Sequence, residues 1–318
     1  MAGSAARWAE RAGLAALAAL ALALPPAAAA SDTLYKYRGE DGEWVYTDRR
    51  PAAADEVEVR PLASAADEGV VIHRRETETG FEVVAENRRW VAVELVLAAM
   101  DLENLAAADE RGVRTVVPAR TGAVVLGLER LDPTLPGRFR FRYQTLPGDP
   151  GASHDPAFVY RFPFAPATRH RVTQAWPDVS THDSLASRHA VDVAVPVGTG
   201  VYAARAGTVF EVAARHFRGG TDRERDLPRA NLVRIVHDDG TMAVYAHLNW
   251  DSIRVRPGET VARGQYIADS GNTGYTTGPH LHFAVQRNAG LRLESVPVRF
   301  AAPDGAVTPR TGMEITAF

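Results

Sequence analysis

The chain has 318 residues, which is long enough for two or three domains with their own hydrophobic cores. Its 46% hydrophobic and 24% charged residues are typical of a globular protein and argue against long disordered segments. A formal net charge of -3, without any basic run, gives no reason to expect a nucleic-acid partner. The absence of cysteine excludes disulfides and thiolate metal sites, which leaves His, Asp and Glu as possible metal ligands.

The first thirty residues have the parts of a secretory signal peptide. Arg7 and Arg11 precede a short apolar run at residues 14–24, and small residues follow at 28–30. This pattern predicts cleavage near Ala30, with an uncleaved membrane anchor as the alternative. No later segment is long and apolar enough to cross a bilayer, so we expect a periplasmic or secreted mature chain without a transmembrane helix.

Residues 31–66 are predicted to form a small β-hairpin domain followed by a linker. Aromatic runs at 34–38 and 44–48 flank a turn rich in Gly and Asp, as in a hairpin. The pattern Y-K-Y-x-x-x-D-G-x-W-V-Y-T-D resembles a small domain of unknown function that often opens periplasmic proteins of Gram-negative bacteria. Residues 51–67, rich in Ala, Pro and acidic side chains, are predicted to be the linker.

Residues 67–160 are predicted to form a β-sandwich-like domain, immunoglobulin-like in outline. Short apolar runs separated by turn residues predict antiparallel strands at 70–72, 81–85, 91–97, 114–117 and 139–143. No cluster of titratable side chains lies among them, which favours a spacer or docking role over a catalytic one.

Residues 161–318 contain most of the histidines of the chain, which are candidates for catalysis or metal binding. Eight of the 10 histidines lie there: His170, His182, His189, His216, His237, His247, His280 and His282. If residues 280–283 form a β-strand, its period of two turns His280 and His282 toward one face. Two imidazoles on one face are half of a zinc site, so the sequence predicts the working domain here.

Asp192 is the first candidate for the other half of this site. In the predicted strand 190–195, Val191, Val193 and Val195 share one parity and are expected in the core. Asp192 shares the other parity with two alanines, from which its carboxylate could reach a metal. The alternative is a solvent-facing aspartate on an edge strand.

The histidine that joins Asp192 is either His182 or His189. His189 is three residues from Asp192, so on the same strand it would point to the opposite face. His182 lies in the loop-like stretch Ser180–Ser184, which can fold back toward the strand. Strand parity therefore favours His182.

A further histidine, His247, ends a predicted strand. Met242, Val244 and Leu248 are expected to form its buried parity, so that Tyr245 and His247 emerge together on the other face. The alternative is a core histidine whose ring nitrogens are satisfied by hydrogen bonds.

These motifs, in this order, resemble the lysostaphin and LytM type of zinc metallopeptidase. They are an upstream His, A-V-D-V-A-V-P-x-G-T, Y-A-H-L and G-N-T-G-x-x-x-G-P-H-L-H-F, and the similarity covers residues 162–286. The family usually has its first His four residues before the Asp, where this chain has Arg188 followed by His189. A subgroup with S-H, a short insertion and R-Y-A-V-D aligns Thr181-His182 with its S-H.

The resemblance implies a mainly β fold, in which an antiparallel β catalytic domain with an open groove follows the sandwich-like and hairpin domains. It implies one Zn²⁺ held by His182, Asp192 and His282, with His247 and His280 as catalytic residues. The implied activity is endopeptidase cleavage of peptidoglycan peptides, at the bond from D-alanine to meso-diaminopimelate in a Gram-negative cell. The alternative is a non-catalytic envelope regulator that activates cell-wall amidases.

Overall fold

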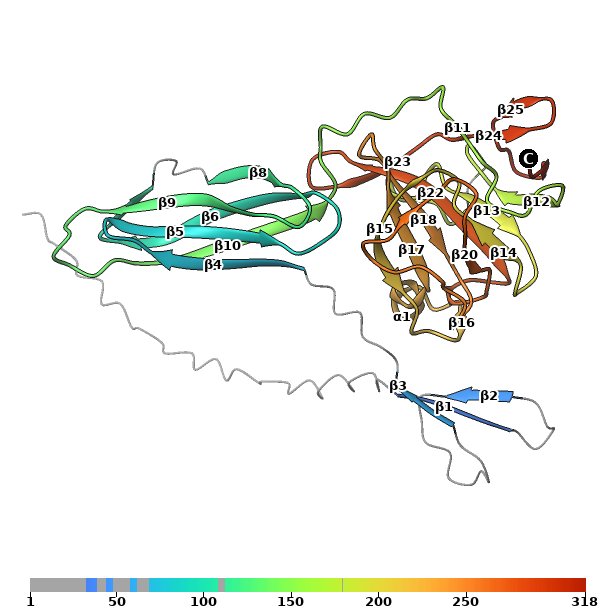
Figure 1. Ribbon diagram of the computed structural model, residues 1–318, viewed down its shortest axis with the longest axis horizontal. Coiled ribbons are helices and arrows are strands. Elements are labelled where there is room, and N and C mark those ends of the chain that lie inside the picture. The colour runs from blue at the N-terminus through green and yellow to red at the C-terminus, as the bar shows by residue number, and fades with distance from the viewer. Residues whose placement is uncertain (1–32, 39–43, 48–57, 62–68, 108–111, 179) are drawn as a thin grey trace, which may run out of the picture. The chain divides into compact units, whose positions relative to one another are not determined.

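The computed structural model describes residues 33–38, 44–47, 58–61, 69–107, 112–178 and 180–318. These residues form mainly antiparallel β-strands, with one short α-helix and one 3-10 turn among them (Figure 1). The predicted mainly β class is therefore confirmed. The chain divides into two compact units, Met1–Ala63 and Ser64–Phe318. The predicted signal peptide at residues 1–30 lies outside the described residues.

The first unit contains a three-stranded antiparallel sheet in the order β2-β1-β3. Its strands are β1 (Thr33–Arg38), β2 (Trp44–Thr47) and β3 (Glu58–Pro61). Pairing of β1 with β2 confirms the predicted hairpin. The prediction of a linker is wrong at residues 58–61, which form β3 against β1. A strand of four residues is too short to show a period of two within an Ala- and Pro-rich stretch.

The second unit begins with two sheets that share one core. The four-stranded sheet has the order β4-β5-β9-β7, and the three-stranded sheet has the order β10-β6-β8. Val83 and Leu128 from the first sheet pack with Leu95 and Phe139 from the second, which makes a sandwich. The strands are β4 (Val70–Glu76), β5 (Gly80–Asn87), β6 (Val93–Glu103), β7 (Leu105–Ala107), β8 (Val113–Val117), β9 (Gly122–Arg130) and β10 (Arg138–Pro147).

A nine-stranded sheet dominates the rest of the unit. Its order is β19-β15-β17-β18-β22-β13-β12-β26, with β23 paired to β22. Its strands are β12 (Arg169–Gln174), β13 (Val191–Ala194), β15 (Gly207–Ala213), β17 (Leu232–Val236), β18 (Met242–Ala246), β19 (Thr260–Val261), β22 (His280–Asn288), β23 (Leu293–Val296) and β26 (Glu314–Thr316).

Smaller elements surround this sheet. They are β11 (Val159–Tyr160), β14 (Gly200–Tyr202), β16 (Gly219–Gly220), α1 (Arg223–Asp226), η1 (Leu227–Arg229), β20 (Tyr266–Asp269), β21 (Gly274–Tyr275), β24 (Arg299–Ala302) and β25 (Gly305–Val307). Among the described residues, no helix combines the length and apolar character needed to cross a bilayer.

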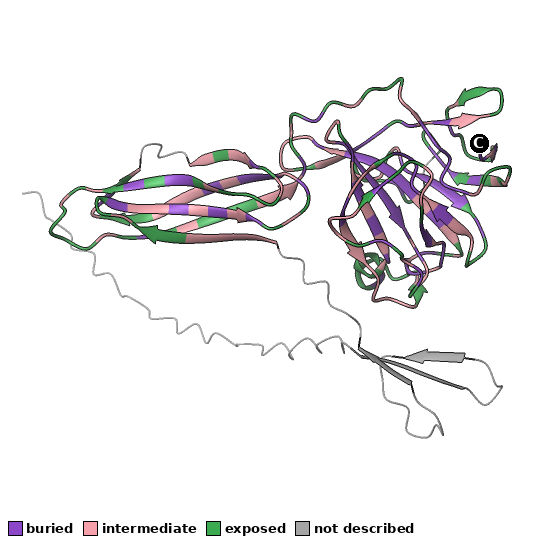
Figure 2. Cartoon of the chain, viewed as in Figure 1, coloured by how far each residue is buried: buried purple, intermediate pink, exposed green. Residues whose placement is uncertain are grey.

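The register of β22 brings the functional side chains together. Its neighbours are β18 and β13, and His282 lies opposite Ala246 on one side and Asp192 on the other. Leu281 and Phe283, of the other parity, are fully buried in the main core. The central strands are accordingly mostly buried in Figure 2. One face of these strands fills the core, and the other presents histidine and aspartate.

The face predicted for Tyr245 is wrong. Tyr245 is fully buried in the main core, where its hydroxyl accepts a hydrogen bond from the Ala204 N–H at 2.7 Å, and burial raises its pKa. Val244, predicted for the core, instead shares its face with Ala246 and therefore with His282. All five residues of β18 are buried, so their alternation carried no information about which face meets the core.

The lowered pKa of His237 leads to a prediction of how the stability of the protein depends on pH. The ring is buried, its Nδ1–H donates to the Ala206 carbonyl at 2.8 Å, and burial lowers its pKa from 6.5 to about 4. Between about pH 4 and pH 6.5, His237 binds a proton in the unfolded chain but not in the folded chain. The stabilisation is therefore fully present above about pH 6.5 and is lost as the pH falls toward 4.

Replacing His237 with Asn keeps a donor for the Ala206 carbonyl but removes the titrating ring. Wild type should lose unfolding free energy when the pH falls from about 7.5 to about 5. We expect this loss to be smaller by about 2 kcal/mol in His237→Asn. Urea unfolding of both proteins at the two pH values measures this difference. An equal loss in both proteins would contradict the assignment.

Candidate metal centre

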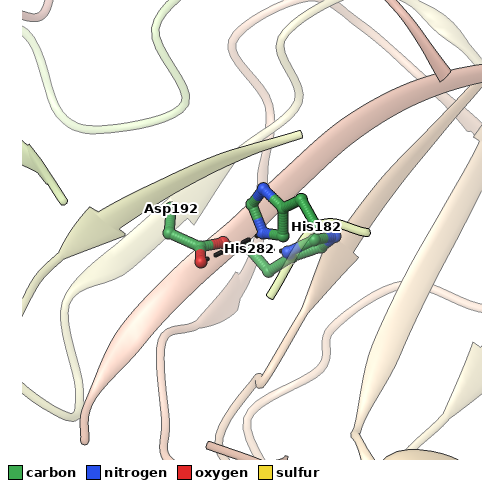
Figure 3. A group of neighbouring side chains, drawn as sticks. All are labelled: His182, Asp192 and His282. Atoms are coloured by element: carbon green, nitrogen blue, oxygen red, sulfur yellow. Dashed lines mark hydrogen bonds and ion pairs between the residues drawn. The ribbon is translucent and has the colours of Figure 1, made fainter. Parts of the chain in front are cut away.

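Three side chains converge on one point of the large sheet. His182, Asp192 and His282 each offer one ligand atom, and these atoms lie within 4.8 Å of one another (Figure 3). Asp192 comes from β13 and His282 from β22, whereas His182 lies in the connection between β12 and β13. His282 Nδ1 is 2.9 Å from Asp192 Oδ1, and His182 Nε2 is 3.1 Å from Asp192 Oδ2.

This donor set fits a divalent cation. His182 is only 4% exposed, and within the described part of the chain neither of its ring nitrogens makes a hydrogen bond, although Nε2 is near Asp192. A buried nitrogen without a partner is costly, and a metal ion would satisfy it. Two imidazoles and one carboxylate also form the kind of zinc set that leaves a fourth position open.

Asp192 supplies the negative charge of this cluster. Burial raises the pKa of Asp192, but the adjacent imidazoles of His182 and His282 outweigh burial and hold the pKa well below its usual range. The carboxylate is therefore ionised at neutral pH, as a metal ligand must be.

His247 and His280 lie beside this cluster with their ring centroids 4.4 Å apart. His247 Nδ1 is 2.7 Å from the Thr273 carbonyl oxygen, and His280 Nδ1 is 2.8 Å from the Gly278 carbonyl oxygen. A carbonyl only accepts, so Nδ1 carries the proton in both rings. In the neutral ring of His247, Nε2 is then left with a free lone pair. Nε2 of His280 lies 3.9 Å from Asp192 Oδ1.

The position and charge state of His247 suit a base. It follows the last residue of β18 with φ at 61°, in the left-handed region, so the backbone leaves the strand there. Although part of its surface is exposed, the protein packed around its ring lowers its pKa to about 3, and the nearby His280 and His282 contribute. His247 is therefore neutral across the physiological range.

His189 lies apart from the cluster. It is in the connection between β12 and β13, where its backbone N–H donates a hydrogen bond to Ser295 Oγ at 2.9 Å. The centroid of its ring is 5.4 Å from that of Trp176. The structure therefore brings together His182, Asp192, His247, His280 and His282, and leaves His189 outside.

A cavity of about 1110 Å³ lies on the β-sandwich rather than at the histidine cluster. It is lined mainly by charged side chains, among which Arg130 pairs with Glu76 and Arg140 with Asp101. Volume alone does not locate chemistry, and this lining offers neither an activated nucleophile nor a histidine. We therefore assign the chemistry to the histidine cluster.

Comparison with known proteins agrees with this choice. Residues 186–293 match the profile of Peptidase family M23, and residues 17–68 match a domain of unknown function, DUF4124. The peptidoglycan DD-endopeptidase ShyA of Vibrio cholerae serotype O1 is 36% identical over 120 residues, which are 38% of this chain and 23% of that protein.

The glycyl-glycine endopeptidase ALE-1 of Staphylococcus capitis is 35% identical over 104 residues, which are 32% of this chain and 25% of that protein. The matched segments thus span about a quarter of the length of these relatives. The family match at residues 186–293 includes Asp192, His247, His280 and His282, whereas His182 lies just before it. Residues 186–293 of this chain are therefore similar in sequence to the peptidases of family M23.

Proposed function

We propose that this protein is a zinc-dependent endopeptidase that hydrolyses peptide cross-links of peptidoglycan, at the bond from D-alanine to meso-diaminopimelate. The observation that carries the proposal is the convergence of His182, Asp192 and His282 within 4.8 Å beside two histidines whose Nδ1 atoms face backbone carbonyls. The names of the relatives, a peptidoglycan DD-endopeptidase among them, support the substrate class. A complete set of donors also argues against the alternative of a non-catalytic regulator.

In this proposal, residues 161–318 form the metallopeptidase domain, and residues 31–66 and 67–160 form separate hairpin and sandwich domains. Residues 1–30 would direct the chain across the inner membrane and be removed near Ala30, which places the enzyme in the periplasm. The substrate is then within reach, because peptidoglycan lies in that compartment.

His182, Asp192 and His282 would hold the zinc ion. When bound, zinc supplies a Lewis acid that polarises the scissile carbonyl and makes water more acidic. His247 Nε2, in a ring that is neutral at pH 7, can take the proton of the attacking water. The imidazolium so formed can then donate its proton to the leaving amine, and His280 Nε2 can accept a hydrogen bond that orients the attacking water.

Digestion of purified murein tests the proposal. We expect cross-linked dimers to become monomers, each cleavage adding one water and exposing a D-alanine carboxylate and a diaminopimelate amine. Mass analysis of the soluble products identifies both ends. A chelator should stop the reaction and added Zn²⁺ should restore it. Release of whole stem peptides from the glycan, or no release with zinc bound, would contradict the proposal.

A further inference from the structure

A β-bulge in β12 lies directly beside the metal centre. Val172 pairs with Val193, and the next paired position joins Gln174 to Asp192, so Thr173 is the extra residue. In an unbroken antiparallel register, Thr173 would lie opposite Asp192 and Gln174 would share the core-facing parity of Val191. The bulge therefore turns Gln174 onto the face that carries the metal centre.

The buried amide of Gln174, only 6% exposed, joins the two segments that carry ligands. Its Oε1 accepts hydrogen bonds from the N–H groups of Ser180 at 2.5 Å and Thr181 at 2.9 Å, and from Ser180 Oγ at 2.6 Å. Its Nε2 donates to Asp192 Oδ2 and to Thr181 Oγ1, each at 2.9 Å. Because backbone N–H groups only donate, the atom facing them is the oxygen, which fixes the orientation of the amide.

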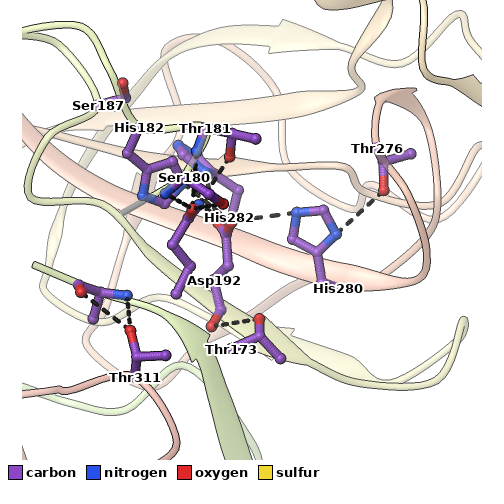
Figure 4. A network of polar contacts seen from close by, with 12 residues as sticks. Thr173, Ser180, Thr181, His182, Ser187, Asp192, Thr276, His280, His282 and Thr311 are labelled. Carbon is purple, nitrogen blue, oxygen red and sulfur yellow. Dashed lines mark hydrogen bonds and ion pairs between the residues drawn. The ribbon is translucent and has the colours of Figure 1, made fainter. Parts of the chain in front are cut away.

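These contacts surround the position of His182. The residues that Gln174 holds, Ser180 and Thr181, immediately precede His182, and Figure 4 shows them grouped beside Asp192 and His282. His182 lies on an irregular connection rather than on a strand, so the sheet itself does not fix its place. The Gln174 side chain thus holds both candidate ligands in place. Its oxygen binds the loop of residues 180–182, which we call the ligand loop, and its nitrogen binds the carboxylate of Asp192.

We propose that Gln174 is a positioning residue of the metal centre, which holds His182 and Asp192 at the separation that zinc requires. The proposal rests on the function proposed above, because it assumes that these residues bind zinc. This role requires a side chain that carries both a donor for Asp192 and an acceptor for the loop, and that is long enough to reach both. Asn is too short to span Asp192 and the loop, Leu can neither donate nor accept, and Glu would lose the donor that faces Asp192.

The test is the zinc affinity of a Gln174→Leu variant of the full chain, measured by competition with a chromophoric chelator. Partners that orient metal ligands are worth about 10- to 100-fold in affinity, and we expect a loss of that size. The absorption spectrum of the Co²⁺-loaded variant should also change, because the geometry of the ligands changes. Circular dichroism checks folding, and Gln174→Asn serves in its place if Gln174→Leu does not fold.

Gln286→Leu is the matched control. Gln286 is a buried glutamine of β22 whose Nε2 donates to the Ala186 carbonyl at 2.8 Å and whose Oε1 accepts from Arg234 at 2.7 Å. It therefore holds the same connection as Gln174 but contacts no candidate ligand. We expect its zinc affinity and Co²⁺ spectrum to match those of wild type.

A double-mutant cycle with His182→Ala tests the route of the effect. If Gln174 acts through the ligand loop, Gln174→Leu should cost less affinity in the His182→Ala background than in wild type. Equal losses in the two backgrounds, equal losses in Gln174→Leu and Gln286→Leu, or an unchanged affinity would overturn the inference. A wild-type chain that binds no zinc would instead refute the proposed function.

Discussion

Replacing His247 with Ala should lower turnover of cross-linked murein by at least about 100-fold, the usual contribution of a general base. The reason is that the Thr273 carbonyl holds the Nδ1–H of His247, which leaves the lone pair of Nε2 to accept the proton of the attacking water. Zinc should stay bound, because His247 is not one of the three converging donors. Product chromatography and elemental analysis of the purified protein measure the two quantities.

Two further variants make this result specific. His247→Asn keeps a side-chain donor near the Thr273 carbonyl and suits the left-handed backbone, but has no nitrogen base, so it should be as inactive as His247→Ala. His189→Ala removes a histidine outside the cluster and should remain active. Unchanged turnover in both His247 variants would exclude this residue as the base.

The second large effect is expected from His182→Ala, which should lose zinc affinity by orders of magnitude because it removes one of three protein ligands. His189→Ala should keep wild-type affinity, since its ring packs near Trp176 and not at the cluster. Chelator competition on both variants makes the comparison. Asp192→Ala and His282→Ala should resemble His182→Ala.

The comparison also decides between His182, which strand parity favours, and His189, which lies one residue after the place of the family's usual first histidine. Loss of zinc in His189→Ala with retention in His182→Ala would reverse the assignment. Equal retention in both would mean that Asp192 and His282 are joined by some other donor.

The alternation of residues along a strand predicted which side chains enter the core wherever one face of the strand is covered and the other carries polar groups. Val191 and Val193 enter the core while Asp192 does not, as the period of two predicts. Leu281 and Phe283 likewise separate from His280 and His282. The same argument gave the wrong face for Tyr245, because β18 is buried on both faces.

Other elements had no signal strong enough to predict. β7 has three residues, and β9 contains two glycines and no aromatic residue, so neither was predicted although both complete a sheet of the sandwich. Gln174 was missed for a different reason. Its place beside Asp192 depends on a one-residue bulge, and a shift of register leaves no trace in the pattern of apolar residues.

The backbone of His247 has a consequence for engineering. A residue with a side chain at φ of 61° carries strain of roughly 1–2 kcal/mol that glycine would not. A search for stabilising substitutions would therefore favour Gly at this position and remove the proposed base with it. At this φ the imidazole leaves the strand and lies beside His280, with the ring centroids 4.4 Å apart. In the proposed mechanism, stability and activity are thus opposed at a single residue.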